Sequence, residues 1–271
     1  MQPIELSVII VNYNGMKYLN GCFGSLYAQL AGINFEIIVL DNDSKDGSCD
    51  HIKQNFKEVR LIESTENLGF GRGNNAAVEA ANGKYLLLIN NDTIVQDHLL
   101  PALEFMRNDE SVGALGIRML DGNGNYIVAA GKFPAPVNMI RLKNMFLMMG
   151  REFRSGNFTK PYYDVDWLGG SFLLMPKKVY DAVGGFDKDY FMYVEDVDLC
   201  KKVANAGYRR VFMPGLSYIH FVGFSRSRDS LVVAGHEMYI RKNMAGFTKI
   251  TSLAALGINK LIKKVKRALG R

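Results

Sequence analysis

The sequence has few cysteines, and none lies in a pattern that pairs or binds metal. Cys22, Cys49 and Cys200 are odd in number, far apart and without metal-ligand spacing, which argues against a disulfide framework and for a reducing compartment. No apolar run of about eighteen residues occurs, and no charged and then apolar leader opens the chain. We therefore expect a cytoplasmic protein that is neither exported nor membrane-spanning.

Acidic residues are missing from the last part of the chain. Residues 238–271 contain nine Lys or Arg and no Asp or Glu. The net charge of +6 belongs to this tail, because the rest of the chain carries 24 basic and 27 acidic residues. A basic tail can bind nucleic acid or an anionic membrane surface. The body of the protein must supply the chemistry.

Strand and helix patterns alternate along the first part of the chain. Apolar strand patterns begin at Leu6, Phe35, Val59 and Tyr85, and helical patterns separate the first three. This rhythm indicates βαβ units and a mainly parallel sheet with right-handed crossovers. At 271 residues and 48% apolar content, the chain is long enough for one large domain or two small ones. The sequence thus predicts an α/β fold.

Polar clusters follow three of these strands, at residues 12–14, 41–44 and 90–92. Because the carboxyl ends of parallel strands meet at one edge of a sheet, we expect the clusters to converge. An Asx turn is the structural alternative for Asn91 and Asp92. The segment NLGFGRGNN adds glycines that permit close backbone approach and Arg72, a planar cation for phosphate oxygens. Its spacing is weak evidence for a dinucleotide fingerprint, because that motif needs G-x-G-x-x-G after the first strand and this segment follows the third.

A second acidic cluster stands before a helical pattern. Glu195, Asp196 and Asp198 occupy its start, where carboxylates also suit the helix dipole without any further role. The preceding GGFD and the aromatic residues Tyr190, Phe191 and Tyr193 give this acid pair, Glu195 and Asp196, little freedom. Such rigidity is typical of a positioned catalytic base, and we favour that interpretation.

Several segments together resemble the ordered motif set of family 2 glycosyltransferases, particularly the rhamnosyltransferase-like bacterial members. They are SVIIVNYNG, IIVLDNDSKDGS, ENLGFGRGNNAAVEAANGKYLLLINNDTIV, WLGGSFLLMPKKVYDAVGGFDKDYFMYVEDVDLCKKVANAGYR and YIHFVGFS, within about residues 6–226. The resemblance implies a GT-A fold in one domain over residues 1–246. Its nucleotide-binding part would cover about 1–120 and its acceptor-binding part about 121–246, followed by a basic amphipathic tail at 247–271.

The resemblance also implies roles for individual residues. It places NND where the family carries a DxD-type motif, so that Asp92, joined by His220, would hold Mg²⁺ or Mn²⁺. Asp196 would be the general base of an inverting displacement, with Glu195 the less favoured candidate. The donor contacts would be Asn12, Tyr13, Asp41, Arg72, Gly73, Asn74 and Asn91. The acceptor contacts would be Trp167, Gly169 and Gly170.

Two of these assignments keep structural alternatives. His220 can be satisfied inside a strand end, and Trp167 can be a core side chain. As the only carboxylate of NND, Asp92 suits a hard cation that is held weakly and completed by phosphate oxygens and water.

The implied reaction moves a sugar from a nucleoside-diphosphate donor, dTDP-rhamnose or a UDP-sugar, to an acceptor in cell-surface polysaccharide synthesis. The acceptor would be a glycan or a polyprenyl-linked sugar. A sugar nucleotidylyltransferase is one alternative, although it should carry a Gly-rich basic signature after the first strand, where VNYNG stands. A non-catalytic module that binds sugar or a partner is the other.

The tail has the pattern of a helix at a membrane interface. One apolar stripe comprises Ile258, Leu261, Ile262, Val265 and Leu269, and the basic residues between them are Lys260, Lys263, Lys264, Lys266 and Arg267. We expect this helix to bind an anionic surface, which would place the enzyme at the inner face of the cell membrane. Packing on the body is the alternative. Nucleic acid is not expected as a partner, because the tail lacks interleaved aromatic residues.

Overall fold

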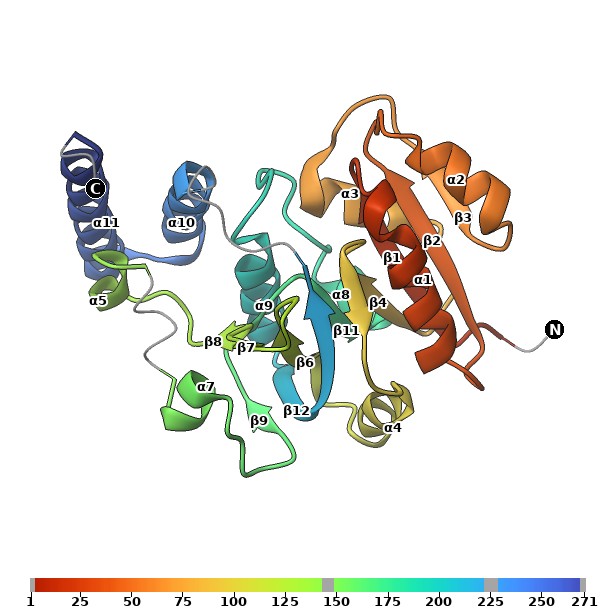
Figure 1. Cartoon of the computed structure of the whole chain (residues 1–271). Coiled ribbons are helices and arrows are strands. Elements are labelled where there is room, and N and C mark those ends of the chain that lie inside the picture. The colour runs from red at the N-terminus through yellow and green to blue at the C-terminus, as the bar shows by residue number, and fades with distance from the viewer. Residues whose placement is uncertain (1–2, 143–148, 222–228, 269–271) are drawn as a thin grey trace.

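A computed structural model describes residues 3–142, 149–221 and 229–268 (Figure 1). A ten-stranded sheet has the order β3-β2-β1-β4-β11-β6-β12-β5, with β7 paired to β6 and β9 to β12, beside a small β8–β10 sheet. The strands are β1 (Leu6–Asn12), β2 (Phe35–Asp41), β3 (Arg60–Glu63), β4 (Tyr85–Ile89), β5 (Thr93–Val95), β6 (Val112–Leu120), β7 (Tyr126–Ile127), β8 (Ala130–Gly131), β9 (Tyr163–Asp164), β10 (Trp167–Leu168), β11 (Phe172–Pro176) and β12 (Arg209–His220).

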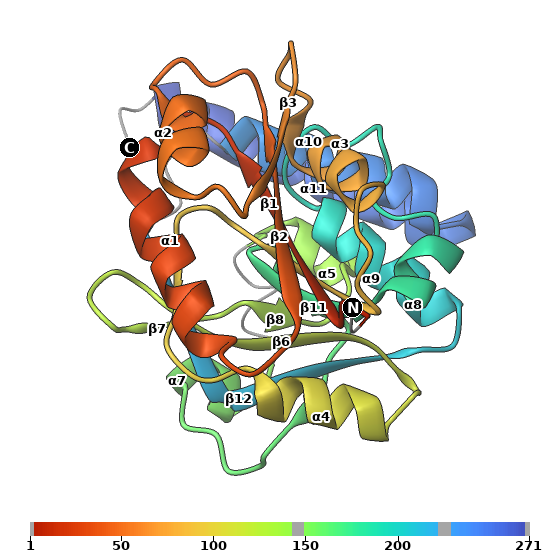
Figure 2. The same cartoon turned by 90° about the vertical axis from the view of Figure 1, so that its right-hand side faces the viewer.

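Helices cover both faces of this sheet, as the two views in Figures 1 and 2 show. The helices of the described residues are α1 (Met16–Gln29), α2 (Ser48–Asn55), α3 (Gly69–Val78), α4 (Leu100–Asn108), α5 (Pro136–Met139), α7 (Arg151–Ser155), α8 (Lys177–Ala182), α9 (Glu195–Asn205), α10 (Asp229–Asn243) and α11 (Gly246–Ala268).

The predicted α/β fold with a mainly parallel sheet is confirmed. Strands β3, β2, β1 and β4 run parallel to one another, and β6 runs parallel to β12. Strand β11 enters between β4 and β6 in the antiparallel direction. The βαβ rhythm of the sequence ends at β4, so the local pattern that predicted parallel pairing does not extend to this insertion.

Two hydrophobic cores lie on opposite faces of the sheet. Val8 and Ile10 of β1 pack in the core that contains Phe23 of α1, whereas Ile9 packs in the core that contains Ala77 of α3. Alternate side chains of a strand point to opposite faces. A continuous apolar run such as that of β1 therefore fills both cores, and its polar successors emerge together at the sheet edge.

The C-terminal helices form a third, smaller core. Helices α10 and α11 lie beside α5 at one end of the molecule (Figure 1). Their shared apolar residues are Met139, Val233, Ile240, Ala255 and Leu256. The tail alternative of packing on the body is thus realised along one face of α11. Across the described ranges, no helix is long and apolar enough to cross a membrane.

Candidate active site

The ends of β1, β2 and β4 meet, which confirms the expected convergence. Asn12 is fully buried at the end of β1. Its amide Nδ2 donates to Asp41 Oδ2 at 2.7 Å, and its Oδ1 accepts from Asn91 Nδ2 at 2.6 Å. One amide side chain therefore bridges all three strand ends.

The loops after β1 and β2 are locked to each other around this bridge. Asn14 has a left-handed φ of 49°. Its backbone N–H donates to Ser44 Oγ at 2.8 Å, and its side-chain oxygen accepts from the Lys45 N–H at 2.8 Å. Gly15 leaves room for the Asn12–Asn91 bond, because a Cβ there would lie 1.9 Å from Asn91 Nδ2. This glycine is a functional position that the sequence reasoning missed.

Two predicted donor residues differ in what they offer a ligand. Tyr13 is 53% exposed beside the bridge, so its ring is available to a flat group such as a base. Asp41 is 1% exposed, and its Oδ1 accepts from the Ser44 N–H at 2.8 Å while Oδ2 is held by Asn12. Its contact with the donor stays a prediction, beside an evident role in ordering both loops.

Asp92 and His220 are brought together by strand pairing. Strands β12 and β5 run antiparallel with His220 opposite Thr93, the residue after Asp92. As a result, His220 Nε2 lies 3.2 Å from Asp92 Oδ1 and 3.3 Å from Asn90 Nδ2. Asn12, Asp41, Asn91, Asp92 and His220 are called the strand-end cluster below.

The strand-end cluster fits a weakly held divalent cation. Within the described part of the chain, no group of three or more His, Cys, Asp or Glu side chains is arranged to hold a metal ion. Asp92 and His220 offer one carboxylate and one imidazole at neighbouring positions. Mg²⁺ and Mn²⁺ commonly use one or two protein ligands plus water and substrate phosphates. The donor set therefore suits a cation that binds with a diphosphate.

The acid pair lies at the start of α9, with Glu195 buried and Asp196 half-buried. Asp196 Oδ2 accepts from the Gly170 N–H at 2.9 Å, and Oδ1 accepts from the Val197 N–H at 2.8 Å. Burial raises the pKa of the Asp196 carboxyl, and these two N–H groups partly oppose the rise. Burial, with the Asp196 charge as a second cause, raises the pKa of the Glu195 carboxyl well above its ordinary range.

Two consecutive residues connect the acid pair to Asn90, the residue before Asn91 of the strand-end cluster. The Gly170 N–H binds Asp196, and the Ser171 carbonyl accepts from the Asn90 N–H at 3.2 Å. A Cβ on Gly170 would lie 3.3 Å from Asp196 Cβ and 3.1 Å from Phe70. Gly170 therefore allows close approach of the acid, and Ser171 is a linking position that the sequence did not single out.

The predicted diphosphate residues on α3 are placed less directly. Arg72 is exposed, and its NH2 lies 3.4 Å from Glu66 Oε1. Gly73 faces the sheet, where a Cβ would lie 3.1 Å from Val11, and buried Asn74 donates to the Phe70 carbonyl at 2.9 Å. Packing of α3 on the sheet thus accounts for Gly73 and Asn74, and their contact with a diphosphate stays a prediction.

The predicted acceptor residues also have packing roles. Trp167 is 6% exposed, and its indole N–H donates to the Lys132 carbonyl at 2.9 Å. Its ring occupies the space above Gly131, where a Cβ would lie 2.6 Å away. Gly169 donates its N–H to Ala129 at 2.7 Å. Core packing explains Trp167, which leaves little of its ring for a sugar, and the three acceptor contacts stay predictions.

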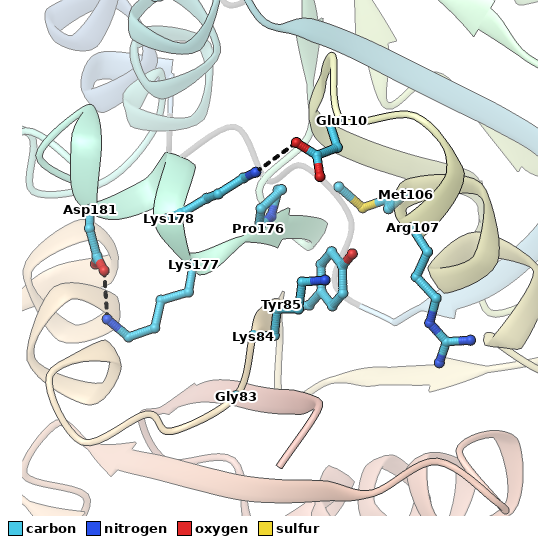
Figure 3. Close-up of a pocket in the computed structure, with 10 residues that line it drawn as sticks. All are labelled: Gly83, Lys84, Tyr85, Met106, Arg107, Glu110, Pro176, Lys177, Lys178 and Asp181. Carbon is cyan, nitrogen blue, oxygen red and sulfur yellow. Dashed lines mark hydrogen bonds and ion pairs between the residues drawn. The ribbon is translucent and has the colours of Figure 1, made fainter. Parts of the chain in front are cut away.

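A cavity of about 320 Å³ lies at the other end of β4 from Asp92 (Figure 3). It is bordered by Tyr85 and Pro176, at the start of β4 and the end of β11. Two of its cations are neutralised, because Lys177 pairs with Asp181 at 2.7 Å and Lys178 with Glu110 at 3.3 Å (Figure 3). The cavity lacks the converging polar groups of the strand-end cluster, which remains the candidate site.

Comparison with known proteins assigns the family. A family model described as glycosyl transferase family 2 matches residues 7–182. The N-acetylglucosaminyl-diphospho-decaprenol L-rhamnosyltransferase of Mycobacterium tuberculosis is 28% identical over 245 residues, which are 83% of this chain and 78% of that protein. Rhamnosyltransferase WbbL of Escherichia coli is 30% identical over 226 residues, covering 79% and 82%.

Solved structures agree on the fold. A mannosyltransferase from Pyrobaculum calidifontis, solved with GDP-Man and Mn²⁺, matches with a TM-score of 0.63 at 19% identity, over 100% of this chain and 79% of that chain. S. aureus TarS, solved with UDP, matches with a TM-score of 0.59 at 19% identity, over 94% and 70%. With its mixed sheet, its strand-end cluster and these relatives, the chain belongs to glycosyl transferase family 2 and has the GT-A fold.

Proposed function

We propose that this chain is an inverting, metal-dependent glycosyltransferase that transfers a sugar from dTDP-rhamnose or a UDP-sugar to a glycan or lipid-linked acceptor in cell-surface polysaccharide synthesis. The observation that carries the proposal is the link through residues 170–171, which joins Asn90, directly before Asn91 of the strand-end cluster, to the acid pair. Relatives named as rhamnosyltransferases support the donor class. The lipid-linked acceptor in the name of the mycobacterial relative supports the acceptor class.

In the proposed reaction, the Asp196 carboxylate removes the proton of the acceptor hydroxyl. The hydroxyl oxygen then bonds to the anomeric carbon on the face opposite the nucleotide, while the bond from that carbon to the diphosphate oxygen breaks. Asp92 and His220 would hold Mg²⁺ or Mn²⁺, whose positive charge stabilises the departing diphosphate. Burial raises the pKa of the Asp196 carboxyl toward neutral pH, which makes its carboxylate a stronger base than an ordinary one.

Donor turnover by the purified full chain tests the proposal. We expect hydrolysis or transfer with a UDP- or dTDP-sugar in the presence of Mn²⁺, with release of the nucleoside diphosphate. Release of pyrophosphate from a nucleoside triphosphate and a sugar phosphate would instead identify a nucleotidylyltransferase. Binding without turnover of any donor, also with lipid-linked acceptors present, would identify a non-catalytic module.

We further propose that α11 holds the enzyme at an anionic membrane surface. Support comes from an apolar stripe that faces away from the third core. Phe247 is 80% exposed, Ile250 66% and Leu261 60%. Ile258, Ile262 and Val265 continue this stripe along the helix. Exposed apolar side chains in such a row are typical of a helix that lies in a membrane interface.

The charges of α11 contribute less than the sequence suggested. Lys260 is paired with Glu237, and Lys263 lies 3.2 Å from Asp229, so two expected membrane cations are neutralised by α10. The side chains of Lys266 and Arg267, and Leu269 as a whole, lie outside the described residues. The exposed stripe therefore carries most of the argument for this interface.

Vesicle co-sedimentation tests the membrane interface with the fold left intact. The full chain should pellet with vesicles that contain phosphatidylglycerol, and the variant Phe247→Gln/Leu261→Gln should lose most of this binding. Tyr162→Gln, a 40% exposed aromatic residue on another part of the molecule, is the matched control and should pellet like the wild type. Equal binding by all three proteins would overturn the proposed interface.

A further inference from the structure

The acid pair follows a turn with an uncommon backbone conformation. Tyr193 has φ of 72° and Val194 has φ of 74°, both in the left-handed region. For a β-branched residue such as Val194 this is a genuine outlier, because Cβ crowds the backbone. Such conformations persist only where the surrounding structure holds them. Residues 193–194 set the direction in which α9 begins, and hence where Asp196 points.

Helix α10 presses on this turn at a glycine. A Cβ on Gly235 would lie 2.5 Å from the Tyr193 carbonyl oxygen and 2.9 Å from Val194 Cγ2. Gly235 is buried in the middle of a fifteen-residue helix, where glycine is unfavourable on intrinsic propensity. Only the missing side chain lets the backbone of α10 support the turn at this distance.

The end of α10 binds both ends of the loop that contains the turn. Asn243 Nδ2 donates to Asp198 Oδ1 at 2.7 Å, and the Asp198 N–H donates to the Val194 carbonyl at 2.9 Å. Lys242 Nζ lies 2.6 Å from carboxylate oxygens of Asp187 and Asp189. The buried Asp198 side chain therefore ties α10 to the first turn of α9.

We propose that Gly235 and Asn243 of α10 are positioning residues that fix the 193–194 turn and thereby aim Asp196 at the acceptor hydroxyl. This inference rests on the proposed function, because it takes Asp196 as the base. A Cβ on Gly235 would meet Tyr193 and Val194 first, and Asn243 binds Asp198; none of these three residues belongs to the strand-end cluster. Their loss should therefore lower the rate of transfer and leave donor binding unchanged.

The variant Gly235→Ala separates positioning from helix stability. Alanine is the better helix former, so the substitution favours α10 itself while it pushes the turn away. Gly257→Ala on α11 is the matched control, because it makes the same change in a helix where a Cβ would meet nothing within 4 Å. We expect Gly235→Ala to lower kcat by roughly 10- to 100-fold, in the range of misplaced catalytic groups, with donor Kd within about twofold. Gly257→Ala should match the wild type.

Asn243 provides a second, independent variant. Asn243→Asp places two carboxylates in contact and should lower kcat and shift the acidic limb of the kcat profile against pH. The exchange Asn243→Asp/Asp198→Asn restores an amide–carboxylate pair and should recover most of the rate and the pH profile. A merely structural role would reduce the folded fraction without moving the pH profile of the protein that remains folded.

Asp196→Asn, measured alongside, separates the two levels of the argument. If Asp196→Asn is inactive while Gly235→Ala and Asn243→Asp keep wild-type kcat, the positioning role is overturned and the base assignment stands. Should Asp196→Asn turn over normally, the base assignment and the positioning role fall together. An equal loss of donor affinity and kcat in Gly235→Ala would also overturn the inference, because it would show a general distortion of the site.

Discussion

The strand-end cluster and the acid pair are held in place by different means. Asn12 joins Asp41 and Asn91 through short side-chain hydrogen bonds, whereas the acid pair depends on a left-handed turn and on a helix that comes some forty residues later in the chain. The strand-end cluster is made rigid by its own polar groups. The acid pair is oriented by neighbouring segments of the chain, and its carboxyl groups have raised pKa values. Donor binding and chemistry should therefore respond to different substitutions.

Asp196→Asn should give the largest separation of the two halves. Loss of a general base lowers turnover by roughly 10²- to 10⁴-fold, while donor binding stays near that of the wild type. Single-turnover kinetics and nucleotide titration measure the two effects. Asp181→Asn, a carboxylate at the far end of the sheet, is the control. Near-normal turnover in Asp196→Asn would remove it as the base.

Turnover of the wild type should also depend on pH through this residue. The base must be ionised, so kcat should fall as the pH drops through the raised pKa of Asp196, at a higher pH than for an ordinary carboxylate.

Asp92→Ala should affect the strand-end cluster and donor binding instead of the acid pair. Removing the only carboxylate of NND should weaken Mn²⁺-dependent nucleotide binding by about 10- to 100-fold, as losses in metal sites typically do, with little change of nucleotide binding without metal. His220→Ala should show the same pattern more weakly. Glu110→Ala, on the cavity of Figure 3, serves as the control. Wild-type metal dependence in Asp92→Ala would make Asp92 a structural residue.

Asn12→Ala tests whether the strand-end cluster is held by its own hydrogen bonds. The change leaves the buried Asp41 and the half-buried Asn91 without their shared partner, which should lower the free energy of unfolding by about 1–3 kcal/mol. Chemical denaturation measures the loss. Asn123→Ala, in the exposed turn before β7, should change stability by less than about 0.5 kcal/mol. Equal stabilities would mean that the strand ends do not need the Asn12 bridge.

Glu195→Gln should have the smallest effect, and the size of this effect depends on pH. Because the folded-state pKa of Glu195 is raised, its stability contribution is present below the unfolded pKa and is lost as the pH rises through the folded value. Glutamine cannot ionise, so the variant should unfold at a higher temperature than the wild type at neutral pH, and the difference should vanish in acid. Glu66→Gln, which is exposed, should show no such trend. A difference in unfolding temperature between Glu195→Gln and the wild type that does not change with pH would contradict a raised pKa of Glu195.

Sequence patterns predicted the arrangement of the strand-end cluster better than that of the acid pair. Polar residues directly after apolar strands predict a common edge, because parallel strands end together, and Asn12, Asp41 and Asn91 do meet there. His220 needed the resemblance to a family, since the pairing of β12 with β5 joins distant segments. The support of the 193–194 turn by Gly235 left only one signal, a glycine in a helical pattern.

Two assignments show why residue type alone is an incomplete guide. Glycines in α3 suggested close approach to phosphate, yet Gly73 lies against Val11 of the sheet. Lys260 and Lys263 suggested membrane contact, yet their charges are neutralised by α10. In both cases the partner lies far away in the sequence, where periodicity and composition carry no information.

The link through residues 170–171 has a consequence for how such enzymes can be altered. These residues lead directly into β11, a central strand paired with β4. The sheet therefore fixes the distance between Asp92 and Asp196. Redesign of the segments that receive the acceptor can change which hydroxyl enters without resetting this span. An insertion between Gly170 and Phe172 would instead change the distance between the two carboxylates, and no choice of donor or acceptor would restore it.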